Sequence, residues 1–236
     1  MNTLLSTAHE TLEHDIDPDF LASVGKNLAW EYPSLFERIN KDPAIPEELK
    51  AEIYSKQRAY CAVKSLLFAC KIHGVPYEFR TLSCNGQKKL LVKIGRIVVI
   101  QEPMLEVLEP PRTSNYKRQL VSATGFVQQI EMDFGDSYRR IIDWSGSLVA
   151  VLLHAPAGPK FTLEDRSLGA FMLGVPNESY TGWLMRLDLH RVAVFGFDAM
   201  TDGVVEPRAT EAPVVQKDNV VVKVRRREIK RNGDVA

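Results

Sequence analysis

The sequence lacks most of the short motifs that identify common enzymes. It has no glycine-rich phosphate-binding loop, no G-x-S-x-G nucleophile elbow and no H-E-x-x-H zinc motif. Asp133-Phe134-Gly135 spells the metal-binding tripeptide of protein kinases, but the other kinase motifs are missing. These absences argue against hydrolases and nucleotide enzymes of familiar design.

Cysteines and long hydrophobic runs are also scarce. The 236 residues include three cysteines, an odd number that argues against a disulfide framework and favours a reducing compartment. The first ten residues have neither the basic segment nor the apolar run of a secretory signal. The most apolar stretch, residues 148–153, is far too short to cross a bilayer. We therefore expect a cytoplasmic protein with no membrane partner.

Neither sign of charge predominates, because 30 basic residues balance 30 acidic ones. The two ends nevertheless differ: residues 1–31 carry six acidic side chains against one lysine, and residues 220–231 carry six basic side chains against one glutamate. Such ends pair within one molecule, pair between two molecules or bind separate partners. Two solvated termini are the ordinary alternative.

The first third of the chain has helical periodicity. Asp17-Pro18 is typical of a helix start, and Pro33 interrupts the pattern, so we expect a second short helix around residues 35–39. The clearest helix runs from Pro46 to Gly74, with a proline at its start and a glycine suited to its end. Its apolar stripe is formed by Leu49, Ile53, Tyr60, Val63, Leu67 and Cys70.

The rest of the chain is typical of β-strands. Asn85-Gly86 and Gly95-Arg96 are turn sequences, and they predict a three-stranded antiparallel meander over residues 77–100. We expect a short helix between residues 113 and 122, and further strands at residues 130–134, 148–153, 168–175, 183–189, 192–197 and 220–224.

The predicted fold is α+β, with N-terminal helices packed on a mostly antiparallel, bent β-sheet. We divide the chain into an N-terminal helical segment at residues 1–45, an α+β core domain at 46–198, and a linker with a basic C-terminal tail at 199–236.

An acidic cluster provides the catalytic candidates. Glu131, Asp133, Asp136 and Asp143 lie close to two arginines in sequence. If residues 130–143 form a hairpin, these carboxylates share one end and could hold Mg²⁺. The candidates are therefore Asp133, Asp136 and His154, with Mg²⁺ as the one cofactor considered. Solvated carboxylates paired with Arg139 and Arg140 are the alternative.

Two other metal patterns fail on geometry, so we predict no metal site. Cys70, His73 and Cys84 are ligands that zinc accepts, but Cys61 falls on the opposite helix face and a fourth ligand is missing. The pattern Asp218…Glu228-x-Lys230 resembles that of metal-dependent nucleases. A single strand between its two acids would hold them roughly 30 Å apart.

Two groups of basic residues could bind nucleic acid or a protein partner. Aromatic residues accompany the first group, as on single-strand or RNA-binding surfaces, although lysines also protect sheet edges from aggregation. The first group is on the predicted meander and the second is in the tail: Lys88, Lys89 and Lys93, then Arg225, Arg226, Arg227, Lys230 and Arg231.

The polarised ends and the lack of a recognisable active site favour a protein–protein interaction module, either an adaptor or one half of a two-protein complex, with self-association included. The alternative is a nucleic-acid-directed protein, such as a divergent metal-dependent nuclease or a toxin-like ribonuclease. A small-molecule enzyme of unfamiliar design is the third class.

Overall fold

The computed structural model describes residues 3–82, 86–104, 109–124, 144, 146–158, 161–163 and 166–195. Residues 1–204 form one compact unit, and the second unit, residues 205–236, lies outside the described residues. The elements follow in the order α1 (Thr3–Asp15), α2 (Pro18–Lys41), α3 (Glu47–His73), β1 (Tyr77–Thr81), β2 (Lys88–Ile94), β3 (Ile97–Pro103), α4 (Asn115–Thr124), β4 (Leu148–Pro156), β5 (Leu168–Pro176), β6 (Trp183–Asp188) and α5 (Leu189–Phe195).

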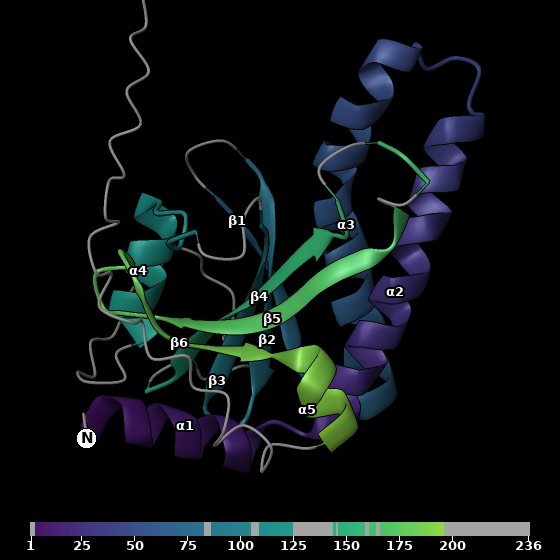
Figure 1. The fold of residues 1–236 in the computed structure, drawn as a ribbon. Coiled ribbons are helices and arrows are strands. Elements are labelled where there is room, and N and C mark those ends of the chain that lie inside the picture. Colours follow the sequence, from purple (N-terminus) through teal and green to yellow (C-terminus); the bar gives the residue numbers. More distant parts are fainter. Residues whose placement is uncertain are drawn as a thin grey trace, which may run out of the picture. The chain divides into compact units, whose positions relative to one another are not determined.

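The six strands form one mixed, mostly antiparallel sheet in the order β1-β2-β3-β4-β5-β6. The central pair, β3 and β4, is parallel, and the other four pairs are antiparallel. Parallel neighbours need a crossover connection, which here contains α4. Helices α2 and α3 run side by side next to this sheet (Figure 1). The predicted α+β fold is confirmed.

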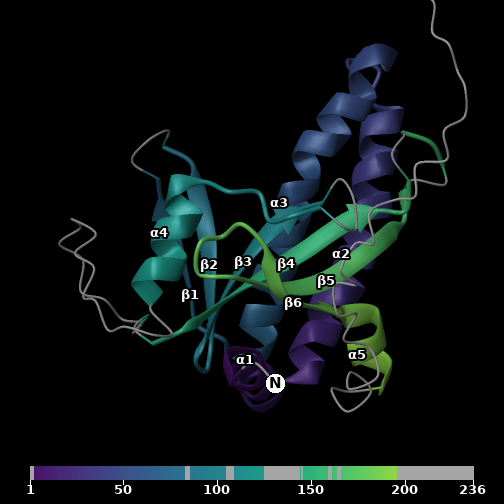
Figure 2. The ribbon, with the colours of Figure 1, turned by 60° about the vertical axis from the view of Figure 1, so that its left-hand side comes forward.

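Helices cover both faces of the sheet, and β4 packs against both layers. Its even-numbered residues, such as Leu152, join a core with α1, α2, α3 and α5. Its odd-numbered residues, such as Val151, join a second core with Leu120 of α4. Because side chains alternate along a strand, an apolar run like that of β4 implies burial on both faces. Figure 2 shows α4 on the opposite side of the sheet from α2 and α3.

The predicted start of α2 and end of α3 are confirmed. The Asp17 carboxylate accepts a hydrogen bond from the Asp19 amide at 2.9 Å, and Pro18 takes the first helical position. Helix α3 ends at Gly74, whose φ of 66° is the left-handed conformation that glycine adopts without strain.

Helix α2 does not break at Pro33, so the prediction of two helices was wrong. The helix continues for 24 residues. Tyr32, Leu35, Phe36 and Ile39 are all buried in the core that α2 shares with α3. A proline inside a helix costs about 3 kcal/mol, and the burial of these side chains on both sides of the proline offsets that cost.

The strand expected at residues 192–197 is also wrong, because residues 189–195 form α5. The Asp188 carboxylate accepts a hydrogen bond from the His190 amide at 3.0 Å and so caps the helix start. Leu189 and Val192, three residues apart, are both buried. Helix α1 was not predicted. The strands expected at 130–134 and 220–224, and the tail at 199–236, lie outside the described residues.

A glycine turn joins α1 to the sheet. The Asp15 carboxylate accepts hydrogen bonds from the Arg96 amide at 2.7 Å and from Arg96 Nε at 2.9 Å. These bonds hold the pKa of Asp15 well below its usual range. Gly95 has a φ of 51°, and a Cβ there would lie 2.7 Å from Asp15 Oδ2. The turn therefore requires glycine for both conformation and space.

We predict that Gly95→Ala destabilises the protein more than Gly74→Ala. Both glycines have a positive φ, which costs an alanine about 1–2 kcal/mol. A Cβ at Gly74 has no atom within 4 Å, whereas at Gly95 it displaces Asp15 and breaks its bonds to Arg96. Urea midpoints measure the difference, and equal losses in the two variants would contradict this role of Asp15.

Candidate functional site

His154, the one catalytic candidate within the described residues, lies fully buried on β4. Its Nδ1 is 2.6 Å from the Tyr32 hydroxyl and its Nε2 is 3.0 Å from Gln101 Oε1. Because an amide oxygen only accepts hydrogen bonds, Nε2 carries the proton and donates. Nδ1 then accepts from the Tyr32 hydroxyl. The ring links α2, β3 and β4.

The surroundings of His154 keep its ring neutral. Burial lowers the pKa of His154 to about 3, and the nearby charge of Arg58 adds to this effect. Burial also raises the pKa of Tyr32, so its hydroxyl keeps its proton. With both ring nitrogens bonded, neither is available to a substrate in this arrangement. A catalytic role alongside Asp133 and Asp136 stays a prediction, because both aspartates lie outside the described residues.

A second buried polar cluster lies on the opposite face of the sheet, under α4. Lys117 Nζ is 2.6 Å from Glu102 Oε1 and donates to the Arg112 carbonyl at 2.6 Å. It also lies 5.5 Å from the centre of the Tyr180 ring. Burial raises the pKa of Glu102 and lowers that of Lys117, while the ion pair opposes both shifts.

Several polar atoms in this cluster have no hydrogen-bond partner among the described residues: Glu102 Oε2, Tyr116 Oη, Trp144 Nε1 and Tyr180 Oη. Tyr180 also has a φ of 57°, an unusual conformation for a residue other than glycine. The Thr113 hydroxyl holds this turn by donating to the Tyr180 carbonyl at 2.9 Å. Buried polar groups of this kind usually bind internal water.

Sequence reasoning missed Glu102, although a signal was present. Glu102 follows Val98 and Ile100 at steps of two, so it shares their covered face of β3. An acidic residue in that register must be buried and needs a cation, which Lys117 supplies from α4.

The meander lysines do not form one basic patch. Lys89 and Lys93 alternate with Leu91 on the α4 side of β2, whereas Lys88 is on the opposite face. Lys93 Nζ donates a hydrogen bond to the Ser147 hydroxyl. The basic tail residues lie outside the described residues, so their role stays a prediction.

No group of three or more potential metal ligands comes together among the described residues. Cys61 and Cys70 are buried, and burial raises their thiol pKa values to about 11 and about 12, which keeps both protonated. Cys84 lies outside the described residues. Within the part of the chain that is described, no helix is long and apolar enough to cross a membrane.

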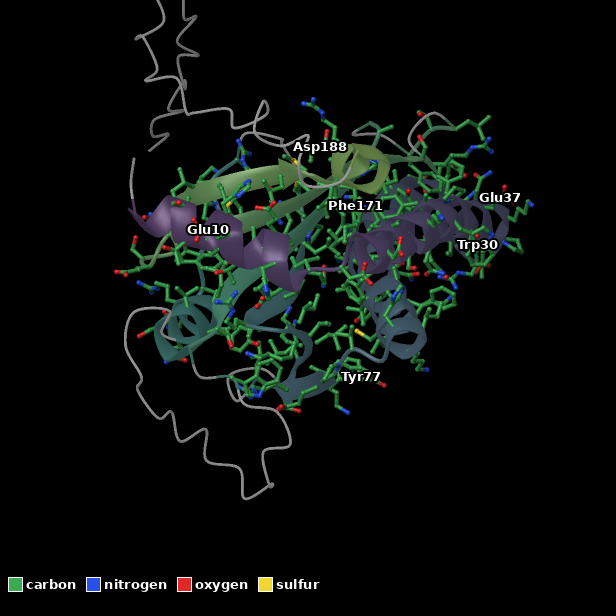
Figure 3. The ribbon with its side chains drawn as sticks, turned by 90° about the horizontal axis from the view of Figure 1, so that it is seen from below. Glu10, Trp30, Glu37, Tyr77, Phe171 and Asp188 are labelled. Atoms are coloured by element: carbon green, nitrogen blue, oxygen red, sulfur yellow. The ribbon has the colours of Figure 1, made fainter. Side chains whose placement is uncertain are left out.

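An exposed row of large apolar side chains crosses α2 and α3. Trp30 and Tyr60 are 62% and 73% exposed, and Phe68 and Ile72 are also exposed. We call these four residues the α2–α3 aromatic surface. The aromatic ring of Trp30, labelled in Figure 3, lies 5.8 Å from Lys64 Nζ of α3.

The apolar stripe predicted for α3 is only partly buried. Leu49 and Tyr60 are exposed, whereas the buried side includes Ala62, Ser65 and Ala69. Small side chains let α3 lie close to α2 and the sheet, so hydrophobicity alone did not mark the packed side.

Comparison with protein-family models, with curated proteins and with solved structures finds no match to this chain.

We predict that His154 makes the protein less stable as the pH falls. In the unfolded chain the histidine pKa is about 6.5, so the ring takes up a proton as the pH falls below that value. In the folded state His154 stays neutral until the pH approaches about 3. Stability is fully present above about 6.5 and declines below it. The urea midpoint should therefore fall more steeply between about pH 7 and about pH 4.5 in the native protein than in His154→Gln. The exposed-site control His190→Gln should keep the native slope, and equal slopes in all three proteins would contradict the prediction.

We also predict that Lys117→Met lowers the free energy of unfolding by about 3–5 kcal/mol, because Glu102 then stays buried without its ion-pair partner. The double variant Glu102→Gln/Lys117→Met should recover most of this loss, since no buried charge remains. Urea denaturation measures both variants. A double variant as unstable as the single one would show that packing, not charge, dominates the cost.

Proposed function

We propose that this chain is a protein–protein interaction module and that the α2–α3 aromatic surface is its docking surface. The observation that carries the proposal is the exposure of Trp30 and Tyr60 on neighbouring helices. Large aromatic side chains bury much apolar area at a small cost in conformational entropy, and they are enriched at the energetic centres of protein interfaces.

The exposed residues of this surface are contiguous, which supports the proposal further. Tyr60, Lys64, Phe68 and Ile72 follow one another at steps of four along α3, so neighbours in this row are adjacent on the helix surface. Lys64 lies beside Trp30 and 2.6 Å from Glu31 Oε1, which connects the row to α2. Single exposed hydrophobic residues are ordinary, but contiguous ones are typical of binding sites.

The surface favours a protein partner of particular chemistry. The row is aromatic and aliphatic except for Lys64, which pairs with Glu31, and Lys71 faces solvent on the same side of α3. A complementary partner presents an apolar patch with carboxylates at its rim. With such a partner, this chain would be an adaptor or one half of a two-protein complex, which are the two forms of interaction module that the sequence favours.

We predict that Trp30→Ser and Tyr60→Ser each reduce capture of the partner at least about tenfold, which corresponds to about 1.4 kcal/mol of binding energy. Their folding stability should change by less than about 0.5 kcal/mol, because both side chains are exposed. The measurement is purification of the tagged full-length chain from its native host at low salt. Light scattering gives the mass of the complex, and mass spectrometry identifies and quantifies the second polypeptide.

Leu163→Ser is the matched control, because Leu163 is an exposed leucine in the β4–β5 connection outside both helices. It should leave capture unchanged. A 260/280 nm absorbance ratio that is raised and drops after nuclease treatment would instead favour the nucleic-acid alternative, especially if binding weakens steeply with salt. A second polypeptide captured equally by all variants would exclude the α2–α3 aromatic surface.

A further inference from the structure

Strand β1 forms one end of the sheet, and its outer edge has no partner among the described strands. The Pro76 carbonyl accepts from the Lys93 amide at 2.9 Å, and the Leu82 amide donates to the Gln87 carbonyl at 2.8 Å. Even-numbered residues therefore direct their backbone groups toward β2. Because these directions alternate in an antiparallel pair, Tyr77, Phe79 and Thr81 direct theirs outward.

The side chains of this edge have only some of the features that protect an edge strand. Short length, charged side chains, proline and bulges all discourage pairing with another chain, and β1 is short and carries Glu78 and Arg80. The five residues of β1 include neither lysine nor proline, and they pair with β2 in a regular register. Tyr77 and Phe79 are 38% and 45% exposed, with ring centroids 6.4 Å apart.

The opposite face of β1 carries one charge of each sign. Glu78 and Arg80 are on either side of Phe79, and Arg80 Nη2 lies 3.4 Å from Glu78 Oε1. The order of these residues, acid then aromatic then base, is complementary to itself when the strand is reversed.

We propose that β1 pairs antiparallel with β1 of a second copy of this chain, with Phe79 opposite Phe79 of the second copy. This inference goes beyond the docking surface proposed above, because it uses a different surface and a different partner. The pairing is symmetric about a two-fold axis, so the same strand serves both protomers. It extends each sheet across the interface.

Backbone and side chains select the same register. With Phe79 at the centre, Tyr77 lies opposite Thr81 of the second copy, and the outward N–H and C=O groups bond in pairs. Glu78 then lies directly opposite Arg80 of the second copy, in the type of pair where side chains are closest. A shift of two residues in either direction places Glu78 opposite Glu78, or Arg80 opposite Arg80, which is unfavourable.

The test is a charge exchange followed by sedimentation equilibrium of the full-length chain. The native protein should rise from 26.6 kDa toward twice that mass between about 1 and about 200 μM. Glu78→Arg and Arg80→Glu each place like charges opposite one another, so each should weaken the dimer at least about tenfold. An equimolar mixture of the two variants restores opposite charges at both positions and should form the dimer again.

Two controls separate this inference from the proposed function. Glu10→Arg changes an exposed glutamate on α1, labelled in Figure 3, and should not affect the mass. Trp30→Ser should dimerise like the native protein, whatever its effect on capture of another polypeptide. A native chain that stays monomeric, a Glu78→Arg variant that dimerises normally, or a mixture that stays monomeric would each overturn the β1 pairing.

Hydrogen exchange of the native protein provides a second measurement that needs no variant. With rising concentration, the amides of Tyr77, Phe79 and Thr81 should gain protection at least about tenfold, while those of Glu78 and Arg80 change little. Protection that is independent of concentration at all five amides would contradict pairing at this edge.

Discussion

The burial of β4 on both faces is the constraint on which the rest of the structure depends. Leu152 and Val151 point to opposite sides, and each joins a separate apolar core. A strand of this kind requires a covering layer on both faces of the sheet. The helices α1, α2, α3 and α5 provide one layer, and α4 provides the other. The parallel β3–β4 pair makes this possible, because its crossover connection carries α4 across the second face.

The two buried polar clusters differ in how completely their groups are bonded. On one face, His154 bonds through both ring nitrogens, to Tyr32 and Gln101, and its ring is neutral. On the other face, Lys117 bonds one oxygen of Glu102, and the second oxygen has no partner among the described residues. A fully bonded network rigidifies a core, whereas a partly bonded one leaves desolvated charge behind. Among the described residues, the α4 side has four buried polar atoms without a partner, whereas the α2–α3 side has two, Asn27 Oδ1 and Arg58 Nε.

Two features of the described surface carry the proposals made above. The α2–α3 aromatic surface leaves Trp30 and Tyr60 in water, and the outer edge of β1 has no partner among the described strands. Trp30 and Tyr60 lie on helices whose inner sides are buried in the core, whereas every described residue of β1 is exposed or half-buried. Burial of such groups against another polypeptide removes apolar area from water and completes backbone hydrogen bonds. These two features support the proposals of an interaction module that docks through α2 and α3 and of a β1 edge that pairs with a second copy.

The sequence by itself determined the α+β class, the start of α2, the end of α3, the β1–β2–β3 meander and the strands β4 to β6, because caps, turn glycines and alternation are local signals. It did not determine that α2 continues through Pro33, because that depends on the burial of side chains against distant parts of the chain. It also did not determine that residues 189–195 are helical, because their apolar run is typical of a strand and hides the helix cap at Asp188. Only the tertiary structure brought Glu102 to Lys117 and Tyr32 to His154, because those pairs are set by strand register and helix packing. For the same reason, only packing decided that Tyr60 faces water while Ala62 and Ala69 face the core.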